Sequence, residues 1–355
     1  MKKLIKFLFL LVVFTTIIAA GVALWGYQVL QQTLHQPLQI EEPVTLDVVP
    51  GTSPARLFAD LQQRQWLERG QLLRRYWQWQ TPEAVLQVGE YPLQPGDSAQ
   101  DLLVRLQRGE VVQRTVTLVE GWTFRQFRAA LARAERLGQT LPTEMTDAET
   151  MVALGLDGHP EGWFFPDTYQ YILGMTDRDI LLRAHRRMQQ VLEQAWAQRA
   201  EDLPIKSPYE ALILASIIER ETGVPHERGE IAGVFSRRLK IGMRLQTDPT
   251  VIYGMGDSYQ GRIRRADLRQ PTPYNTYVID GLPPTPIAMP GREAIEAAVN
   301  PQPGSSLYFV ARGDGSHTFS DNLRDHNRAV RKYQIEQRAE NYRSSPPPTP
   351  RENAR

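Results

Sequence analysis

The segment SPYEALILASIIERETG, residues 207–223, carries the strongest structural pattern in the chain. Ser207 is placed to cap a helix, Pro208 stands at its first position, and Glu210 is the residue that would complete a capping box. Gly223 follows the apolar run, where a helix is expected to end in a left-handed residue. Apolar side chains cover most sides of this helix, which predicts that it is buried in the core of its domain.

Glu219 lies near the C-terminal end of that apolar run, in line with Leu212 and Ala215 at helical spacing. Burial disfavours the charged form of a carboxyl group, so the pKa of Glu219 should be raised. A carboxyl group that stays protonated near neutral pH can donate a proton to a glycosidic oxygen. The residues alone leave two alternatives open. Glu219 could be a structural partner of an arginine, or the catalytic group could be Glu221, on a different line of the helix.

The N-terminus predicts the compartment. Three lysines within residues 1–6 precede the uncharged run FLFLLVVFTTIIAAGVALWGY at residues 7–27, which ends in the aromatic residues Trp25 and Tyr27. About twenty apolar residues are needed to cross a bilayer, and a secretory signal has a shorter apolar region. We expect a single-pass inner-membrane helix at 7–27, a cytoplasmic N-terminus at 1–6 and a catalytic domain in the periplasm. Small residues near the end of the run leave a cleaved signal open as the alternative.

Composition excludes several classes of protein. The 355 residues include 41 Lys and Arg against 40 Asp and Glu, so no basic field points to nucleic acid as a partner. The chain has no cysteine, which rules out disulfides and thiolate chemistry. No histidine pair has the spacing of a zinc-binding helix, and no G-x-S-x-G motif occurs. We therefore expect neither a metal site nor a cofactor.

A short pattern recurs three times before the buried helix. It reads VVPGTSPARL at 48–57, LQPGDSAQDL at 93–102 and LVEGWTFRQF at 118–127. In each copy a glycine permits a tight turn, and a Ser or Thr two residues later caps the helix that follows. Such strand–turn–helix units resemble the LysM type of carbohydrate-binding module, and a plain α+β domain is the alternative. We expect a stalk at 28–43 and a LysM-like α+β region at 44–140.

The rest of the chain is predicted to form a mixed α/β catalytic domain at 145–342. The overall fold class is therefore α+β, with an N-terminal transmembrane helix and the active-site helix lying in a cleft. The motif EGWFFPD, from residue 161, is interpreted as core packing, with Glu161, Trp163 and Phe164 lining the cleft as the alternative. Outside the buried helix, we expect helices at about 177–199, 226–240 and 322–342, a strand at 307–311, and Pro- and Gly-rich loops over 246–303. The tail at 343–355 is too polar and proline-rich to pack, which indicates disorder.

Several long segments of the chain resemble the YceG-like family and occur in the family's order. They are EGWFFPDTY, LILASIIERETG, GVFSRRLKIGMRLQTDPTVIYGMG, TPYNTY, GLPPTPI and SHTFSDNLRDHN. The resemblance covers nearly the whole chain, including the N-terminal anchor. It implies an enzyme that cuts peptidoglycan glycan strands, with the first glutamate of the helix motif, Glu219, as its catalytic acid and base.

The resemblance also implies the reaction. Members of the family cleave the β-1,4 bond between N-acetylmuramic acid and N-acetylglucosamine without water and leave a 1,6-anhydromuramyl end. It further suggests work beside peptidoglycan synthases, with strand termination as a role. A hydrolase that uses Asp248 as a second carboxylate and a non-catalytic glycan-binding protein are the two alternatives. Six residues, rich in hydroxyl, amide and aromatic groups, are the expected glycan contacts: Gln246, Thr247, Asp248, Tyr253, Asn275 and Tyr277.

Overall fold

The computed structural model describes residues 2–82 and 85–337, and internal contacts divide the chain into two compact units. The first unit holds the residues up to 114 together with 136–138 and 170–175. The second holds 115–135, 139–169 and the described residues from 176 onward. This division differs from the boundary expected at 140–145, because residues 115–135 belong with the second unit. The tail at 343–355 and the last residues of the expected catalytic domain lie outside the described residues.

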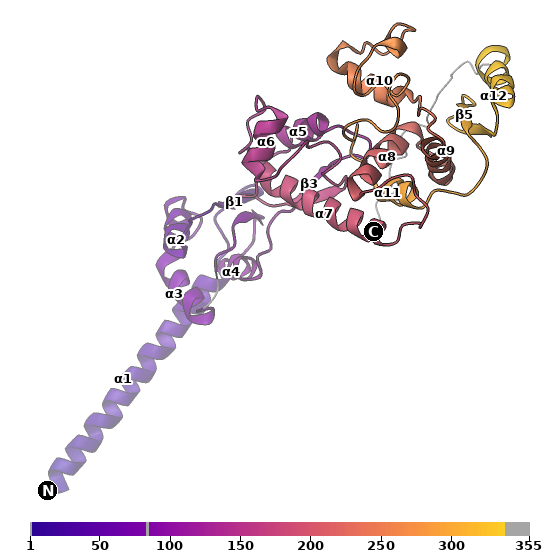
Figure 1. Cartoon of the computed structure of the whole chain (residues 1–355). Helices are drawn as coiled ribbons and strands as arrows, with labels where there is room; N and C mark the ends of the chain where they lie inside the picture. Colours follow the sequence, from indigo (N-terminus) through magenta and orange to yellow (C-terminus); the bar gives the residue numbers. More distant parts are fainter. Residues whose placement is uncertain (1, 83–84, 338–355) are drawn as a thin grey trace. The chain divides into compact units, whose positions relative to one another are not determined.

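The first unit contains an antiparallel pair of strands, and two helices separate these strands along the chain (Figure 1). Its elements are α1 (Lys2–His35), β1 (Val44–Val48), α2 (Pro54–Gln63), α3 (Gly70–Gln80), β2 (Gly89–Leu93) and α4 (Ala99–Arg108). In the register of the two strands, Val44 lies opposite Leu93 and Val48 lies opposite Gly89. The helices α2 and α3 pack against each other, and apolar side chains from all six elements form one core. The turn and cap signals of the sequence predict the helices α2 and α4, whereas α3 begins without a side-chain cap and was not predicted.

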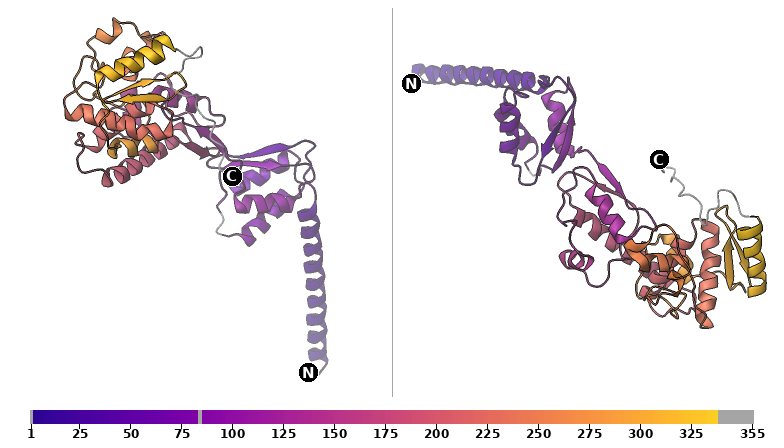
Figure 2. Two further views of the ribbon diagram at one scale, coloured as in Figure 1. Left: turned by 90° about the vertical axis from the view of Figure 1, so that its right-hand side faces the viewer. Right: turned by 90° about the horizontal axis from the view of Figure 1, so that it is seen from above.

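The helix α1 is long and apolar enough to cross a membrane, and its residues up to Tyr27 are exposed. It extends as one uninterrupted helix beyond the packed part of its unit (Figure 2). The structure differs from the stalk expected at 28–43. Leu34, Leu38 and Ile40 are buried in the core of the first unit, so much of this segment is part of the folded unit. The segment was predicted as a stalk because it is rich in glutamine, and the few apolar residues that face this core were not recognised.

The capped turns predicted from the repeated pattern are confirmed. Gly51, Gly96 and Gly121 all have φ between +76° and +93°, a region that favours glycine. Each is followed by a helix whose cap accepts a hydrogen bond from a backbone N–H, and full capping boxes form at Ser98 and Thr123. The third copy lies in the second unit, so the pattern repeats local turn chemistry across two units.

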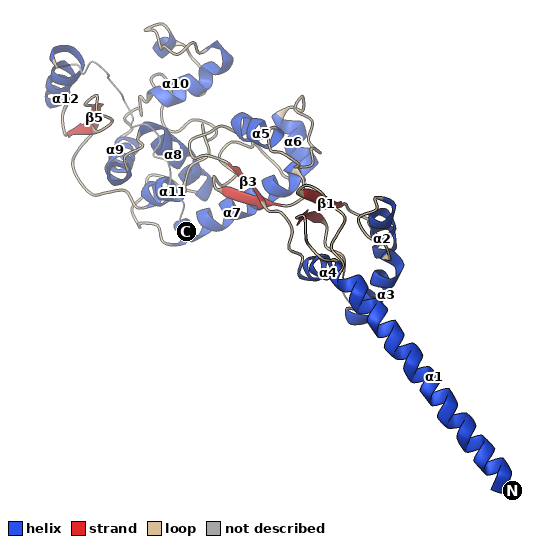
Figure 3. Cartoon of the chain, turned by 180° about the vertical axis from the view of Figure 1, so that it is seen from behind, coloured by secondary structure: helices blue, strands red, loops and turns tan. Residues whose placement is uncertain are grey.

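The second unit is dominated by helices, and its strands are short (Figure 3). Up to the buried helix the elements are β3 (Arg114–Thr117), α5 (Phe124–Ala132), α6 (Asp147–Leu154), β4 (Thr168–Tyr171), α7 (Asp177–Ala197) and α8 (Pro208–Glu221), and Arg114 of β3 and the last two residues of β4 are counted with the first unit. After it come η1 (Pro225–Glu227), α9 (Arg228–Lys240), α10 (Asp248–Met255), η2 (Gly256–Ser258), η3 (Asp267–Arg269), α11 (Arg292–Val299), β5 (Tyr308–Ala311), β6 (His317–Ser320), α12 (Leu323–Val330) and the π-helical turn η4 (Arg331–Glu336). Strands β3 and β4 pair, and so do β5 and β6. The helices α10 and α11 lie within the segment that was expected to consist of loops.

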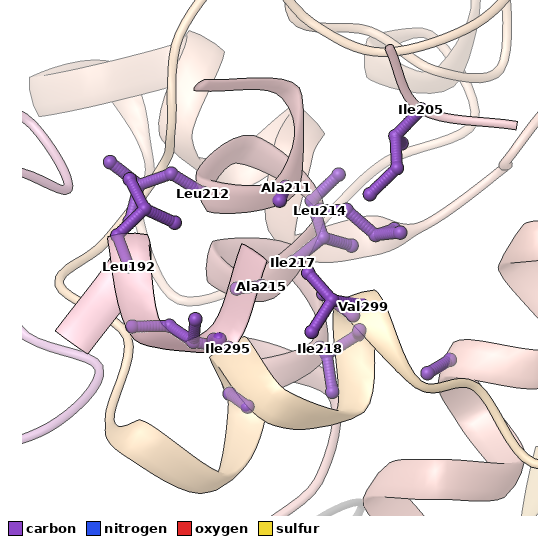
Figure 4. Packing of buried hydrophobic residues seen from close by; sticks show 14 of the residues in the cluster. Leu192, Ile205, Ala211, Leu212, Leu214, Ala215, Ile217, Ile218, Ile295 and Val299 are labelled. Carbon is purple, nitrogen blue, oxygen red and sulfur yellow. The ribbon is translucent and has the colours of Figure 1, made fainter. Parts of the chain in front are cut away.

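The helix α8 is the centre of the second unit, as its apolar pattern predicts. All residues from 211 to 218 are buried, and α8 packs against α7, α9, α10 and α11. Side chains such as Leu192 of α7, Ile218 of α8 and Ile295 of α11 meet in one cluster (Figure 4). Full burial of such a side chain contributes about 1.5–3 kcal/mol. This packing fixes the position of any polar side chain near the end of α8.

Candidate active site

The boundaries of α8 place Glu219 in its last turn. The hydroxyl of Ser207 accepts a hydrogen bond from the Glu210 N–H at 3.2 Å, which confirms the N-terminal cap. The C-terminal end lies where the sequence predicts it, but the predicted glycine cap is wrong. The helix ends at Thr222 in an extended conformation, with φ −139°, and Gly223 does not adopt a left-handed conformation. The chain leaves α8 without the tight turn that a glycine cap would produce and leads directly to η1 and α9.

Glu219 is shielded and held by the start of another helix. Its side chain is 7% exposed, and its Oε2 accepts a hydrogen bond from the Gly291 N–H at 3.0 Å. Gly291 is the N-cap residue of α11, where unpaired N–H groups favour a carboxyl group. The carboxyl group therefore has a fixed orientation before any ligand arrives.

A backbone segment from the start of the second unit lies beside Glu219. Gly121 donates its N–H to the Met289 carbonyl at 2.9 Å, and Met289 donates its N–H to the Trp122 carbonyl at 2.8 Å. A Cβ atom added to Gly121 would lie 3.8 Å from Cγ of Glu219. Sequence reasoning missed this neighbour, because the third copy of the capped turn had been assigned to the LysM-like region.

The arginines considered as structural partners of Glu219 have other hydrogen-bond acceptors. Arg220 donates to the Gly121 carbonyl at 3.1 Å, Arg237 to the Ser306 carbonyl at 2.7 Å, and Arg244 to Asp280 at 2.9 Å. The cation near Glu219 is Arg228 instead. Its Nη2 lies 3.8 Å from Oε1 of Glu219, which is beyond hydrogen-bond distance.

Burial raises the pKa of Glu219 above its ordinary value, as the sequence predicts. The hydrogen bond from Gly291 and the charge of Arg228 act in the opposite direction, and the charges of Glu120 and Glu293 add to the rise in pKa. The protonated form is thus favoured while the carboxyl group keeps a defined hydrogen-bond donor. These are the properties that a general acid needs near neutral pH.

The alternative candidate, Glu221, has a different environment. Its Oε1 accepts a hydrogen bond from the Thr247 hydroxyl, and burial raises its pKa to about 7. The nearby charge of Asp248 adds to this rise in pKa, and Arg238 opposes it. Glu221 is therefore also able to hold a proton near neutral pH, so chemical competence alone does not separate it from Glu219.

A third buried carboxyl group belongs to Glu161, which is 3% exposed. Its Oε1 accepts from the Phe124 N–H at 2.9 Å, and its Oε2 accepts from the Tyr253 hydroxyl at 3.1 Å. Burial raises the pKa of Glu161 to about 8. The core assignment of the EGWFFPD motif is confirmed, since Phe164 is fully buried. The carboxyl group joins the start of α5 to α10, a link that the sequence did not indicate.

Gly162, next to Glu161, yields a prediction about stability. It has φ +84°, and an added Cβ would lie 2.5 Å from Cγ of Pro286 and 3.3 Å from Cδ2 of Leu212. Gly162→Ala is expected to lower the free energy of unfolding by roughly 2–4 kcal/mol, from overpacking and backbone strain together. Denaturant unfolding measures this loss. The matched control is Gly155→Ala, with φ +72° and no atom within 4 Å. Equal losses in the two variants would contradict the overpacking argument.

The six expected glycan contacts divide by exposure. Gln246 and Asp248 are exposed, and Tyr253 and Tyr277 are half-buried. Thr247 and Asn275 are 2% and 1% exposed, so they are placed to support the loops.

Hydrogen bonds hold several of these residues in place. Asn275 donates to the Gln270 carbonyl at 2.8 Å, and the Tyr277 hydroxyl donates to Asp248 at 2.6 Å. Composition suggested sugar contacts, but it could not show which amides and hydroxyls are used inside the fold. Over residues 2–82 and 85–337, no group of three or more acidic or histidine side chains is arranged to hold a metal ion.

A model of the YceG-like family matches residues 46–332. The chain belongs to the YceG-like family. The match includes the capped turns, α8 with Glu219, and the loops that carry the six expected glycan contacts. It ends inside η4, before the residues that lie outside the described structure.

Two relatives and one solved structure extend this result. The endolytic murein transglycosylase of Bacillus subtilis strain 168 is 29% identical over 335 residues, covering 89% of this chain and 91% of that protein. The endolytic murein transglycosylase of Streptococcus pneumoniae serotype 2 strain D39 is 28% identical over 353 residues, covering 90% of this chain and 63% of the relative. The crystal structure of a YceG-like protein from Listeria monocytogenes matches with a TM-score of 0.53 and 26% identity, covering 81% of this chain and 98% of that one.

Proposed function

We propose that this protein is an endolytic lytic transglycosylase of peptidoglycan, with Glu219 as its catalytic acid and base. The observation that carries the proposal is the carboxyl group of Glu219, which is shielded, oriented by the Gly291 N–H, and raised in pKa by burial. The names of the Bacillus and Streptococcus relatives support the substrate class.

In the proposed reaction, one carboxyl group serves two proton transfers. Since Gly291 donates to Oε2, the proton is held on Oε1, and it passes to the oxygen that leaves C1 of N-acetylmuramic acid. The C1–oxygen bond breaks, and the ionised Glu219 then accepts the proton of the sugar's own 6-hydroxyl as that oxygen bonds to C1. The products are a 1,6-anhydromuramyl end and a strand that begins with N-acetylglucosamine. No attacking water is needed, so no second carboxylate has to activate one.

The exposed loop residues are proposed to hold the glycan. Gln246 and Asp248 offer polar groups at the surface, and Tyr253 and Tyr277 offer half-buried aromatic rings. Thr247 and Asn275 are proposed to position the two segments that carry these residues, around 246–253 and 275–277. Thr247 joins the two segments, because it donates its N–H to the hydroxyl of Thr276 at 3.0 Å. A cleft around Glu219 that accepts a polysaccharide strand is part of the proposal.

The decisive experiment uses the soluble portion of the chain, which starts at residue 28. It digests uncrosslinked glycan with this protein and determines the mass of both new ends. The proposal expects anhydro ends, which are one water lighter than reducing ends. Reducing ends would indicate a hydrolase, and intact strands after prolonged incubation would indicate a non-catalytic glycan-binding protein. Either result would overturn the proposed reaction.

The first unit is proposed to be a LysM-like glycan-binding region. The order β1, α2, α3, β2 supports this proposal, because modules of that type are built from a strand, two helices and a strand. Sedimentation of the soluble portion with insoluble peptidoglycan tests it when Glu219→Gln prevents cleavage. Absence of co-sedimentation would remove this role from the first unit.

The N-terminal helix is proposed to anchor the protein in the inner membrane, with both units in the periplasm. The apolar surface of α1 up to Tyr27 supports this proposal. We expect the full chain to remain in the membrane fraction after an alkaline wash, and a chain starting at residue 28 to stay in solution. Release of the full chain by the wash would contradict the anchor. Work beside peptidoglycan synthases and termination of growing strands complete the proposed role.

A further inference from the structure

Arg228, the first residue of α9, lies beside the proposed catalytic carboxyl group with incomplete hydrogen bonding. It is 8% exposed, and its Nη1 pairs with the Glu293 carboxylate. Its Nη2 lies 3.8 Å from Oε1 of Glu219, beyond hydrogen-bond distance. Its Nε is buried and has no hydrogen-bond partner among the described residues. Leaving a buried donor without a partner is unfavourable, so this guanidinium group is stabilised if a further acceptor comes within reach.

Residues at the start of α11 contact both Glu219 and Arg228. Gly291, the N-cap of α11, donates to Glu219, and Glu293, two residues later, pairs with Arg228. The side chain of Glu293 is 65% exposed, so water reaches this carboxylate, whereas Glu219 and Arg228 are largely buried. One nitrogen of the guanidinium group is therefore paired with a solvent-exposed carboxylate, while another lies near the buried one.

The backbone of Arg228 is fixed, so any approach to Glu219 must come from its side chain. The preceding residue, Glu227, is 5% exposed and is held by His317, whose N–H and Nδ1 lie 2.8 and 2.7 Å from its two carboxylate oxygens. This contact joins β6 to the turn that starts α9. A rotation of the guanidinium group is enough to shorten a 3.8 Å separation to a charge-assisted hydrogen bond.

We propose that Arg228 is a positioning residue for Glu219, held back by Glu293 while Glu219 is protonated and moving onto Oε1 once that proton has passed to the leaving oxygen. In this arrangement Glu293 helps to keep the resting carboxyl group protonated, and Arg228 stabilises the carboxylate until the 6-hydroxyl returns a proton. This inference rests on the proposed function and assigns two residues that assist it.

The charged groups that face Glu219 come from several elements. Glu120 precedes α5, Arg228 begins α9, Glu293 lies on α11, and Arg220 is the neighbour of Glu219 on α8. Glu120 and Glu293 raise the pKa of Glu219, and Arg228 lowers it. Changes at positions 228 and 293 should therefore move the pKa of Glu219 in opposite directions, which a purely structural role would not produce.

The test is the pH dependence of kcat/KM for release of anhydro-ended fragments by the soluble portion of the chain. Activity requires protonated Glu219, so the rate falls as pH rises through its pKa. Glu293→Gln frees Arg228 and is expected to move this fall to lower pH by roughly one pH unit. Arg228→Gln is expected to move it to higher pH and to lower kcat about tenfold, because the carboxylate loses its support. Arg228→Lys keeps the charge and should restore most of the wild-type position.

A double variant separates the direct charge effect of Glu293 from the effect carried by Arg228. The charge of Glu293 acts on Glu219 directly, and this part of its effect should persist in the Arg228→Gln background. If Glu293 also restrains the guanidinium group, its replacement should move the profile less in that background than in the wild type. Glu296→Gln is the matched control, because Glu296 lies on the same helix, 53% exposed, beside Arg292. That variant should leave the profile in place. Additive shifts in the double variant would overturn the role of Arg228.

The outcomes distinguish this inference from the proposed function. No anhydro-ended fragments from the wild-type chain would overturn the function itself. If the wild type is active and Glu293→Gln shows the same pH profile as the wild type, only the inference is overturned. Glu293→Gln changes a solvent-exposed side chain, so this variant should fold even if Arg228→Gln does not. A profile that moves to lower pH in Glu293→Gln and to higher pH in Arg228→Gln supports the assignment.

Discussion

Replacement of Glu219 by glutamine is expected to lower the release of anhydro-ended glycan fragments by roughly a thousandfold, since general acid–base groups contribute about 10²–10⁴-fold and this one acts twice. Glutamine keeps the shape of the side chain, and its amide oxygen can still accept the hydrogen bond from Gly291. The variant should therefore remain folded, with thermal unfolding close to that of the wild type. Mass spectrometry of the digest measures the loss.

The matched control is Glu221→Gln, which removes another raised-pKa carboxyl group from the same helix. We expect this variant to cut glycan strands, because Glu221 contacts Thr247 and has no part in the proposed proton transfers. If Glu221→Gln abolished cleavage while Glu219→Gln did not, the catalytic role would pass to Glu221. Undiminished cleavage by Glu219→Gln would also end the present assignment.

Replacement of Glu161 by glutamine is expected to stabilise the protein at pH 8 by roughly 4 kcal/mol, and to have little effect near pH 4.5. The pKa of Glu161 is raised to about 8 from an ordinary value of 4.5. Between these values the folded state holds a proton that the unfolded state has released. Stability therefore falls as pH rises through this window, and the full penalty is present above pH 8.

Glutamine removes this titration and can keep both contacts, since its oxygen accepts from Phe124 and its amide can donate to the Tyr253 hydroxyl. Unfolding in denaturant at several pH values measures the difference. The control is Asp157→Asn, which removes an exposed carboxylate nearby in sequence. A stability difference between Glu161→Gln and the wild type that does not change between pH 5 and 8 would show that Glu161 does not titrate as its burial indicates.

The sequence was most informative where one local pattern determines the outcome. The apolar run of α8 predicted its burial, Ser207 predicted its cap, and the raised pKa of Glu219 followed from its place on that helix. The ends of α7 and α9 were also close to those expected from caps and glycines.

The sequence could not identify contacts between distant segments. Gly291 is 72 residues from Glu219 along the chain, and the stretch around Gly121 is still further away. Neither partner is marked by a residue type that predicts such a contact, because both act through the backbone. The burial of Asn275 was missed for a related reason, since an amide that binds sugar and one that ties a loop have the same composition.

The unbroken course of α1 has a consequence for the proposed membrane anchor. No flexible joint separates the apolar stretch ending at Tyr27 from Leu34, which is already locked in the core of the first unit. Seven helical residues span roughly 10 Å, so the proposed anchor would hold the core of the first unit about that far from the end of the apolar stretch. The proposed anchor and the proposed glycan binding by the first unit would together keep bound glycan close to the bilayer.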